Sequence, residues 1–169
     1  FLVRWTDRFL FQKHLDYRNI LETLTNRILA VSSVDQIADM TVTAFSDLLR
    51  INNCCVWIKD AEHNSFVLKA ARGDAKQTDL SLSSPLIKCF HNRRAPVYRD
   101  DLPNDSEHLD ALTFLLNERH FEVCFPLFVQ DNLLGIHSLV QKKSHAFYLN
   151  KEIRILKNFC GGLAMSISN

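Results

Sequence analysis

The side chains best suited to chemistry in this chain are five cysteines and seven histidines, and their spacing limits what they could do. The cysteines form no Cys-x-x-Cys pair, and the histidines form no His-x-x-x-His pair or Cys/His cluster at the spacing of metal ligands. Because the number of cysteines is odd, a disulfide framework is also disfavoured. We therefore predict no metal site, and expect buried or idle thiols in a reducing compartment such as the cytoplasm. The cysteines are Cys54, Cys55, Cys89, Cys124 and Cys160, and the histidines are His14, His63, His91, His108, His120, His137 and His145.

One histidine, His137, lies in the middle of an apolar strand and could face a ligand. The plainer interpretation is a sheet histidine with a satisfied hydrogen bond, and we favour it. Asp100 and Asp101 are neighbouring carboxylates, but adjacent residues point apart, so a turn explains them better than acid–base catalysis. The chain has neither a Gly-x-x-x-x-Gly-Lys phosphate loop nor a serine on a nucleophile elbow. We therefore predict no catalytic residue in this segment.

The composition is that of one ordinary globular domain. The chain has 169 residues, of which 47% are hydrophobic and 23% charged, with a net charge of +1. This length can bury a sizeable core, and the small net charge offers no field that would attract nucleic acid. No stretch reaches the ~18 apolar residues of a membrane span. The sequence begins with Phe1 rather than Met, so we expect a segment of a longer protein.

Both ends of the chain carry helical patterns with apolar seams. From Tyr17 to Val31 the apolar residues recur in steps of four and three, and residues 148–168 repeat the pattern. A seam of this kind needs a partner helix, so we predict that the terminal helices mediate a homodimer. Gly161-Gly162 interrupts the second seam and predicts a close helix contact there. The seam residues are Tyr17, Leu21, Leu24 and Ile28 in the first helix, and Ile153, Leu156, Cys160 and Leu163 in the second.

Between these helices the pattern changes to that of strands. Ser33-x-x-Gln36 has the form of a capping box and begins a second helix, which Asn52-Asn53 ends. The order of elements predicts an α+β fold, in which long terminal helices cover one face of an antiparallel sheet. A roof of short helices and loops then covers the other face. The predicted strands are 54–59, 66–71, 95–98, 122–130 and 133–142, and the roof is the excursion over 73–121.

A sheet with a roof can enclose a ligand pocket. Strand alternation puts either Cys55 and Trp57 or the residues between them toward the roof, and the sequence leaves this choice open. The alternative to a pocket is that these side chains fill each other's space as core. The candidate pocket residues are Cys55, Trp57, Leu86, Phe90, Tyr98, Phe114, Phe125 and His137.

From Tyr17 to Asn169 the sequence resembles a GAF domain. The resemblance rests on "AFSDLLRI" followed by "CCVWIKD", on "RRAPVYRDDL", and on "FPLFVQDNLLGIHSLVQKK" followed by "FYLNKEIRILKNFCGGLAMSISN". It implies the GAF fold, for which the related PAS fold is the alternative, with residues 17–169 as the domain and 1–16 as a linker or helical extension. The opening "VRWTDRFLFQKHLDYRNIL" also resembles the segment between a membrane span and a GAF domain in bacterial sensor histidine kinases.

The resemblance implies a dimeric sensory module that passes a small-molecule signal to an output domain downstream in the same chain. The host would be a signalling protein such as a histidine kinase, tethered to a membrane upstream of residue 1. It names no cofactor, because the Asn-Lys…Phe…Asp-Glu set of cyclic-nucleotide-binding relatives is missing, Cys89-Phe90-His91 only approximates a bilin attachment site, and we find no haem or metal motif. The alternatives are a degenerate GAF domain that only dimerises and spaces its neighbours, and a thiol-based redox enzyme.

Overall fold

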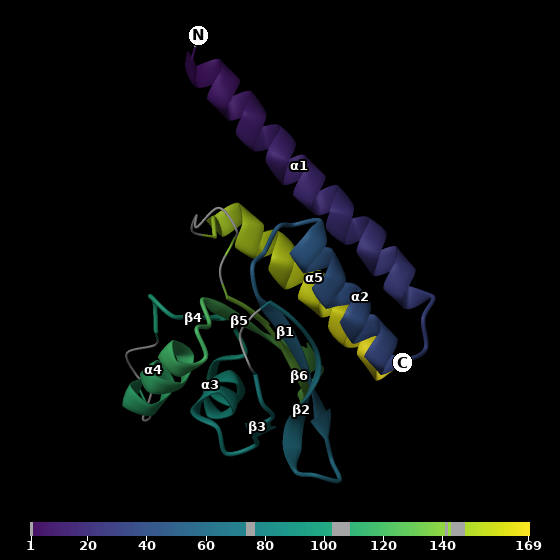
Figure 1. Ribbon diagram of the computed structural model, residues 1–169, viewed down its shortest axis with the longest axis vertical. Coiled ribbons are helices and arrows are strands. Elements are labelled where there is room, and N and C mark those ends of the chain that lie inside the picture. Colours follow the sequence, from purple (N-terminus) through teal and green to yellow (C-terminus); the bar gives the residue numbers. More distant parts are fainter. Residues whose placement is uncertain (1, 74–76, 103–108, 141, 143–147) are drawn as a thin grey trace.

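The computed structural model describes residues 2–73, 77–102, 109–140, 142 and 148–169, with the side chains of the first helix described at Gln12 and from Leu15 onward. Helices and strands follow one another along these residues in the predicted order, with one additional short strand, β3, that was not predicted (Figure 1). The helices are α1 (Leu2–Leu29), α2 (Val34–Asp47), α3 (Pro85–Arg93), α4 (Leu109–Glu118) and α5 (Asn150–Ser168). The strands are β1 (Cys54–Asp60), β2 (Ser65–Arg72), β3 (Leu80–Ser81), β4 (Val97–Tyr98), β5 (Val123–Val129) and β6 (Asn132–Leu139).

The strands form one antiparallel sheet in the order β3-β2-β1-β6-β5-β4. The central strands β1 and β6 pair from Cys54↔Leu139 to Ile58↔Gly135. A Cβ on Gly135 would lie 2.4 Å from the carbonyl oxygen of Trp57, so no other residue fits this position without a shift of the backbone. Gly135 is therefore a point of close approach between β6 and β1.

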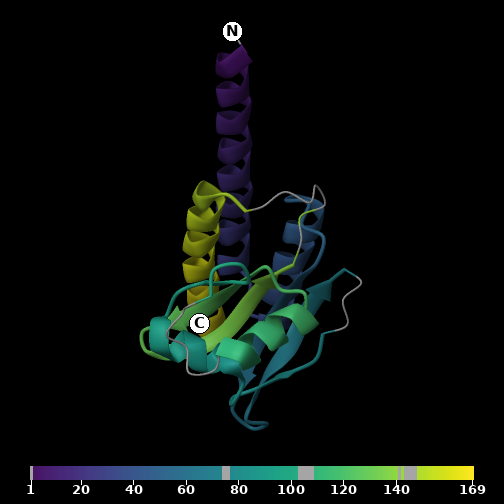
Figure 2. The same ribbon diagram turned by 90° about the vertical axis from the view of Figure 1, so that its left-hand side faces the viewer.

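One face of the sheet carries the three longest helices. α1, α2 and α5 lie together over this face, and α1 and α5 run side by side in the same direction (Figures 1 and 2). Val56 from β1 and Phe125 from β5 point into this layer, where Phe45 of α2 and Leu156 of α5 are fully buried. The apolar steps of four and three along the helices produce this packing, because they place one continuous stripe against the sheet.

The other face is covered by α3, α4 and the loops around them. Here Cys55 and Trp57 of β1 pack against Leu86 and Phe90 of α3 and Leu112 of α4. The sheet is thus buried on both faces, which explains why all five residues Cys54–Ile58 are buried instead of alternating with exposed positions. The predicted α+β fold, with terminal helices on one face and a roof on the other, is confirmed.

Local sequence signals account for several element boundaries. Ser33 caps α2 by accepting a hydrogen bond from the Gln36 amide at 3.4 Å, and Pro85 occupies the first turn of α3. Gln130 and Asp131 form the β5–β6 turn, and the φ of Gln130 is 53°. The predicted strands 122–130 and 133–142 placed this turn one residue later, at Asp131-Asn132. The predicted start of α4 at Asp105 or Ser106 lies outside the described residues.

The first helix reaches well beyond the rest of the domain. α1 is continuous from Leu2 to Leu29, and its N-terminal half projects past α2 and α5 (Figures 1 and 2). Its contact with the body begins at Tyr17, the first side chain of the described part of α1 that is buried. Among the described residues, no helix has the length and apolar content needed to cross a bilayer.

Candidate functional site

The structure divides the predicted pocket residues between the two faces of the sheet. Four of them, Cys55, Trp57, Leu86 and Phe90, come together under the roof. The side of β1 that carries Cys55 and Trp57 is therefore the side that faces the roof. The other four do not join them. Phe125 belongs to the helix layer, Tyr98 packs against that same layer, His137 contacts Phe45 of α2, and Phe114 is 68% exposed. The expectation that all eight line one pocket is therefore wrong, because neighbouring strand positions alternate between faces.

Large side chains fill the space beneath the roof. Trp57 is fully buried, its indole N–H donates to the carbonyl oxygen of Thr78 at 3.1 Å, and its ring meets that of Phe121 edge to face at 5.5 Å. Phe90 is also fully buried in this cluster. These side chains pack against one another and fill the space, as expected for a hydrophobic core.

His137 is buried in the helix layer as a neutral side chain. Its Nδ1 lies 3.0 Å from the carbonyl oxygen of Cys55, and its ring packs edge to face on Phe45 at 4.6 Å. Burial lowers the pKa of His137 to about 4, and the hydrogen bond to Cys55 only partly opposes this. The interpretation of His137 as a sheet histidine with a hydrogen bond fits this environment.

The buried thiols lack the electrostatics of reactive cysteines. Cys55, Ser138 and Cys124 are paired across β1, β6 and β5, and all three are buried. Burial raises the pKa of Cys55 to about 12 despite the nearby Ser138 hydroxyl and Arg119 guanidinium, and raises that of Cys124 well above its usual range. A nucleophilic cysteine needs the opposite shift, so these thiols are suited to packing.

The predicted dimer seams are buried inside the protomer. All eight seam residues are at most 9% exposed, and they pack between α1, α2, α5 and the sheet. The seams did identify helices that need apolar partners, but those partners are in the same chain. Gly162 contributes to this contact, since a Cβ there would lie 3.3 Å from Cγ2 of Thr25 on α1, whereas Gly161 faces open space.

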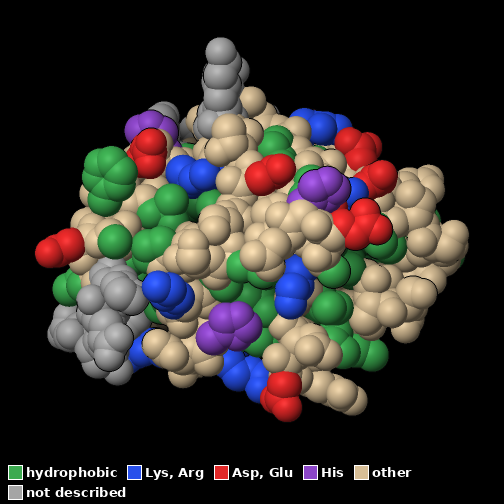
Figure 3. All heavy atoms as spheres, turned by 90° about the horizontal axis from the view of Figure 1, so that it is seen from below, with side chains coloured by type: hydrophobic (Ala, Val, Ile, Leu, Met, Phe, Trp, Pro, Cys, Tyr) green, Lys and Arg blue, Asp and Glu red, His purple; other side chains and the backbone are tan. Residues whose placement is uncertain are grey.

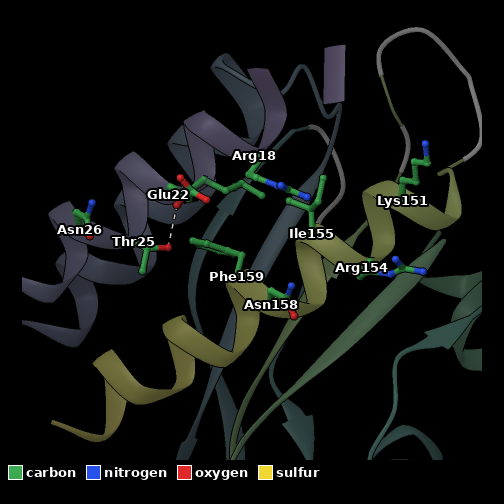
Figure 4. A pocket seen from close by; sticks show the side chains of 10 residues that line it. Arg18, Glu22, Thr25, Asn26, Lys151, Arg154, Ile155, Asn158 and Phe159 are labelled. Atoms are coloured by element: carbon green, nitrogen blue, oxygen red, sulfur yellow. Dashed lines mark hydrogen bonds between the residues drawn. The ribbon is translucent and has the colours of Figure 1, made fainter. Parts of the chain in front are cut away.

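A groove runs along the outside of the α1–α5 pair. It encloses about 710 Å³, and Leu21, Ile155 and Phe159 form its apolar floor (Figure 4). Thr25, whose hydroxyl donates to the Leu21 carbonyl oxygen at 2.8 Å, lies beside Phe159. The rim is polar and is made of Arg18, Glu22 and Asn26 from α1 and Lys151, Arg154 and Asn158 from α5.

The rim carries more positive than negative charge, and its charged groups form no ion pairs among the described residues. It contains three cations, Arg18, Lys151 and Arg154, and one carboxylate, that of Glu22. By contrast, the opposite end of the molecule, around α3 and β3, shows acidic and basic side chains scattered together (Figure 3). Within the described part of the chain, the groove is therefore one surface where shape and charge could bind a partner. Sequence reasoning missed it, because its rim residues look like ordinary solvent-facing positions of two helices.

One exposed turn gathers possible metal ligands. Asp60, Glu62 and His63 lie together between β1 and β2, and His63 Nδ1 is 2.7 Å from Asp60 Oδ2. The hydrogen bond from His63 lowers the pKa of Asp60. These contacts explain the turn as a local structure without an ion.

Comparison with solved structures gives the same fold. The GAF domain of a phosphoenolpyruvate-protein phosphotransferase from Coxiella burnetii is 25% identical, with 92% of this chain and 94% of that chain covered and a TM-score of 0.68. Residues 122 to 287 of a methyl-accepting chemotaxis protein are 19% identical, with coverages of 86% and 94% and a TM-score of 0.65. The free methionine-R-sulfoxide reductase of Neisseria meningitidis is 13% identical, with coverages of 92% and 90% and a TM-score of 0.70.

The comparison of sequences gives the family directly. No curated protein is similar enough to this chain to count as a relative. The family model for the GAF domain, however, matches residues 33–167, which is most of the chain. Together with the sheet, the roof and the helix layer, this match shows that the chain belongs to the GAF domain family.

Proposed function

We propose that this GAF domain is a regulatory module that works through the outer surface of α1 and α5 and not through a ligand under its roof. The observation that carries the proposal is the groove between these two helices, with its apolar floor and uncommitted rim charges. The filled space around Trp57 favours the alternative of a GAF domain without a small molecule at that position. GAF domains are generally regulatory or sensory modules of signalling proteins, which agrees with this role.

The occupant that we propose for the groove is a second copy of the chain. A two-fold axis that crosses α1 at right angles between Arg18 and Glu22 would place Arg18 of each copy near Glu22 of the other, so that the charges on α1 are complementary between copies. Ile155 and Phe159 would supply the apolar centre of such an interface. This dimer retains the predicted use of the terminal helices but moves the contact from their buried seams to their outer faces.

The directions of α1 and α5 also bear on the kind of protein to which we propose this domain belongs. α1 enters the domain and α5 leaves it in the same direction, so both would continue into neighbouring parts of a longer chain. A histidine kinase on the cytoplasmic side of a membrane is the host that the sequence resemblance favours. A thiol enzyme is the less favourable alternative, because burial raises the pKa of Cys54 and Cys55 to about 12.

Sedimentation equilibrium of the chain and of matched variants tests the dimer. Ile155→Glu should give monomers, whereas Phe114→Glu, on an exposed roof position, should sediment like the parent chain. Arg18→Glu and Glu22→Arg should each weaken association by about fivefold or more, and the double variant should restore it. A parent chain that is monomeric at every concentration would refute the proposal, as would disruption by Phe114→Glu alone.

A further inference from the structure

Three residues of the roof, Gln77–Asp79, form a strap between the end of α4 and the sheet. They lead directly into β3, and groups from β1, β2 and the end of α4 bond to them. Trp57 of β1 donates from its indole N–H to the Thr78 carbonyl oxygen at 3.1 Å. The Asp79 carboxylate accepts from the backbone N–H of Leu68 in β2 at 2.8 Å. The strap is therefore the acceptor for donors on two different strands.

A single cation, Arg119, contacts all three residues of the strap. Its Nη1 donates to the Thr78 carbonyl oxygen at 2.8 Å and to Gln77 Oε1 at 3.3 Å. Its Nη2 donates to Thr78 Oγ1 at 3.1 Å and to the Asp79 carbonyl oxygen at 3.5 Å. In return, the Gln77 side-chain amide donates to the Arg119 carbonyl oxygen at 3.1 Å. A guanidinium suits this role, because its N–H groups point in fixed directions and can reach several acceptors at once.

The C-terminal end of α4 positions Arg119. The helix ends in a turn in which His120 adopts the left-handed conformation, with a φ of 57°, and the Phe121 amide donates to the Leu116 carbonyl oxygen at 3.0 Å. Leu116 and Phe121 are both buried in the core under the roof. The backbone at Arg119 is therefore anchored on both sides by core residues, whereas its side chain is only half-buried.

The strap itself contributes no apolar side chain to the core. Gln77 is half-buried, and Thr78 and Asp79 are exposed. The next residue, Leu80, is buried and pairs with Phe66 of β2, so β3 has an apolar anchor that the strap lacks. Segments that are held by exposed hydrogen bonds and not by buried apolar contacts open at a lower free energy than the core does.

We propose that Gln77–Asp79 opens and closes as one unit, and that Arg119 is the clamp that keeps it closed. The closed strap occupies the indole N–H of Trp57 and the amide of Leu68. Opening removes both acceptors together and admits solvent to β1 at Trp57, while β3 stays paired with β2. Trp57 belongs to the core under the roof, and α1 and α5 cover the other face of the sheet. The strap therefore goes beyond the proposed regulatory surface and does not require the dimer.

Hydrogen exchange followed by NMR at two N–H groups tests the strap. The indole N–H of Trp57 and the backbone N–H of Leu68 are on different strands, but each has its acceptor on the strap. After correction for their intrinsic rates, the two groups should be protected equally, because one opening exposes both. Both should be less protected than the hydrogen-bonded amides of the central β1–β6 pair.

Substitutions at the clamp should change both rates together. Arg119→Ala should speed exchange at both groups by about tenfold, because the loss of several hydrogen bonds makes opening easier. Arg119→Lys should act almost as strongly, because an ammonium cannot reproduce the fork of the guanidinium. Gln77→Ala removes two of the contacts at a loop position and should speed exchange by about threefold, even if Arg119→Ala does not fold. Arg94→Ala is the matched control, because Arg94 also bonds to a loop, at Asp131, and its loss should leave both rates unchanged.

Unchanged exchange at both groups in Arg119→Ala and Gln77→Ala would overturn the clamp, as would an equal effect of Arg94→Ala. Acceleration at only one of the two groups, or equal acceleration throughout the helix layer, would overturn the single opening unit. Failure of the dimer would appear separately, in sedimentation, and would leave these rates unaffected.

Discussion

At the residue scale, burial decides which side chains can change their protonation state. His137 illustrates this, because its ring is enclosed by the helix layer and its pKa is lowered to about 4. In the unfolded chain the pKa of a histidine returns to ~6.5. The unfolded state therefore binds the proton more tightly, and His137 opposes folding at any pH where the unfolded chain is protonated at this residue.

The stability of the domain should consequently fall in mild acid. As the pH drops from ~6.5 toward 4, the unfolded chain takes up a proton at His137 while the folded chain does not. This difference should lower the free energy of unfolding by about 3 kcal/mol, with no effect above that range. Urea unfolding at a series of pH values measures this slope. His137→Gln should flatten it, while His91→Gln, at an exposed position, should not. An unchanged slope in His137→Gln would show that other groups cause the acid sensitivity.

Trp57 should be a main support of the roof. Trp57→Ala removes the largest fully buried side chain among the described residues and should lower the free energy of unfolding by about 3–5 kcal/mol. Phe114→Ala, on an exposed ring, should change it by less than about 0.5 kcal/mol. Thermal or urea unfolding compares the two variants. Added indole should partly restore the stability of Trp57→Ala by filling its cavity, and equal effects of the two substitutions would contradict the packed roof.

At the element scale, the contact between α1 and α5 depends on two adjacent glycines with different surroundings. A Cβ at Gly161 meets nothing within 4 Å, whereas one at Gly162 would lie 3.3 Å from Thr25 Cγ2. Glycine costs about 1 kcal/mol relative to alanine inside a helix. Only Gly162 therefore has a packing reason to remain glycine.

Substitutions at these two positions should separate helix propensity from helix packing. Gly161→Ala should raise the free energy of unfolding by about 1 kcal/mol. Gly162→Leu should lower it by about 1–3 kcal/mol, because the side chain would force α1 away from α5. Urea unfolding of both variants provides the measurement. Equal stabilisation by both would mean that α1 does not pack at Gly162.

Periodicity predicted the elements well, because each helix and strand carries its own apolar pattern. The partner of a pattern is harder to predict. The seam through Tyr17 and Leu21 requires an apolar neighbour, but a single sequence does not say whether that neighbour is in the same chain. The roof-facing side of β1 was left open for a similar reason, since both faces of β1 are covered and Cys54–Ile58 are all apolar. The groove depends on contacts between α1 and α5, which lie far apart in the sequence, and local patterns do not contain such contacts.

At the scale of the whole molecule, the domain is a sheet on one face of which α1 and α5 lie side by side. α1 projects beyond the body at one end, and α5 begins beside its middle (Figure 2). Movement of either helix must change the groove, because it is lined by residues of both α1 and α5. The outer face of this helix pair is therefore where we expect regulation to act.

Hydrogen–deuterium exchange at low and high protein concentration tests this claim most directly. The account predicts that raising the concentration slows exchange in residues 15–29 of α1 and 150–160 of α5, and leaves α3 and α4 unchanged. Slower exchange confined to α3 and α4, or no dependence on concentration anywhere, would contradict it.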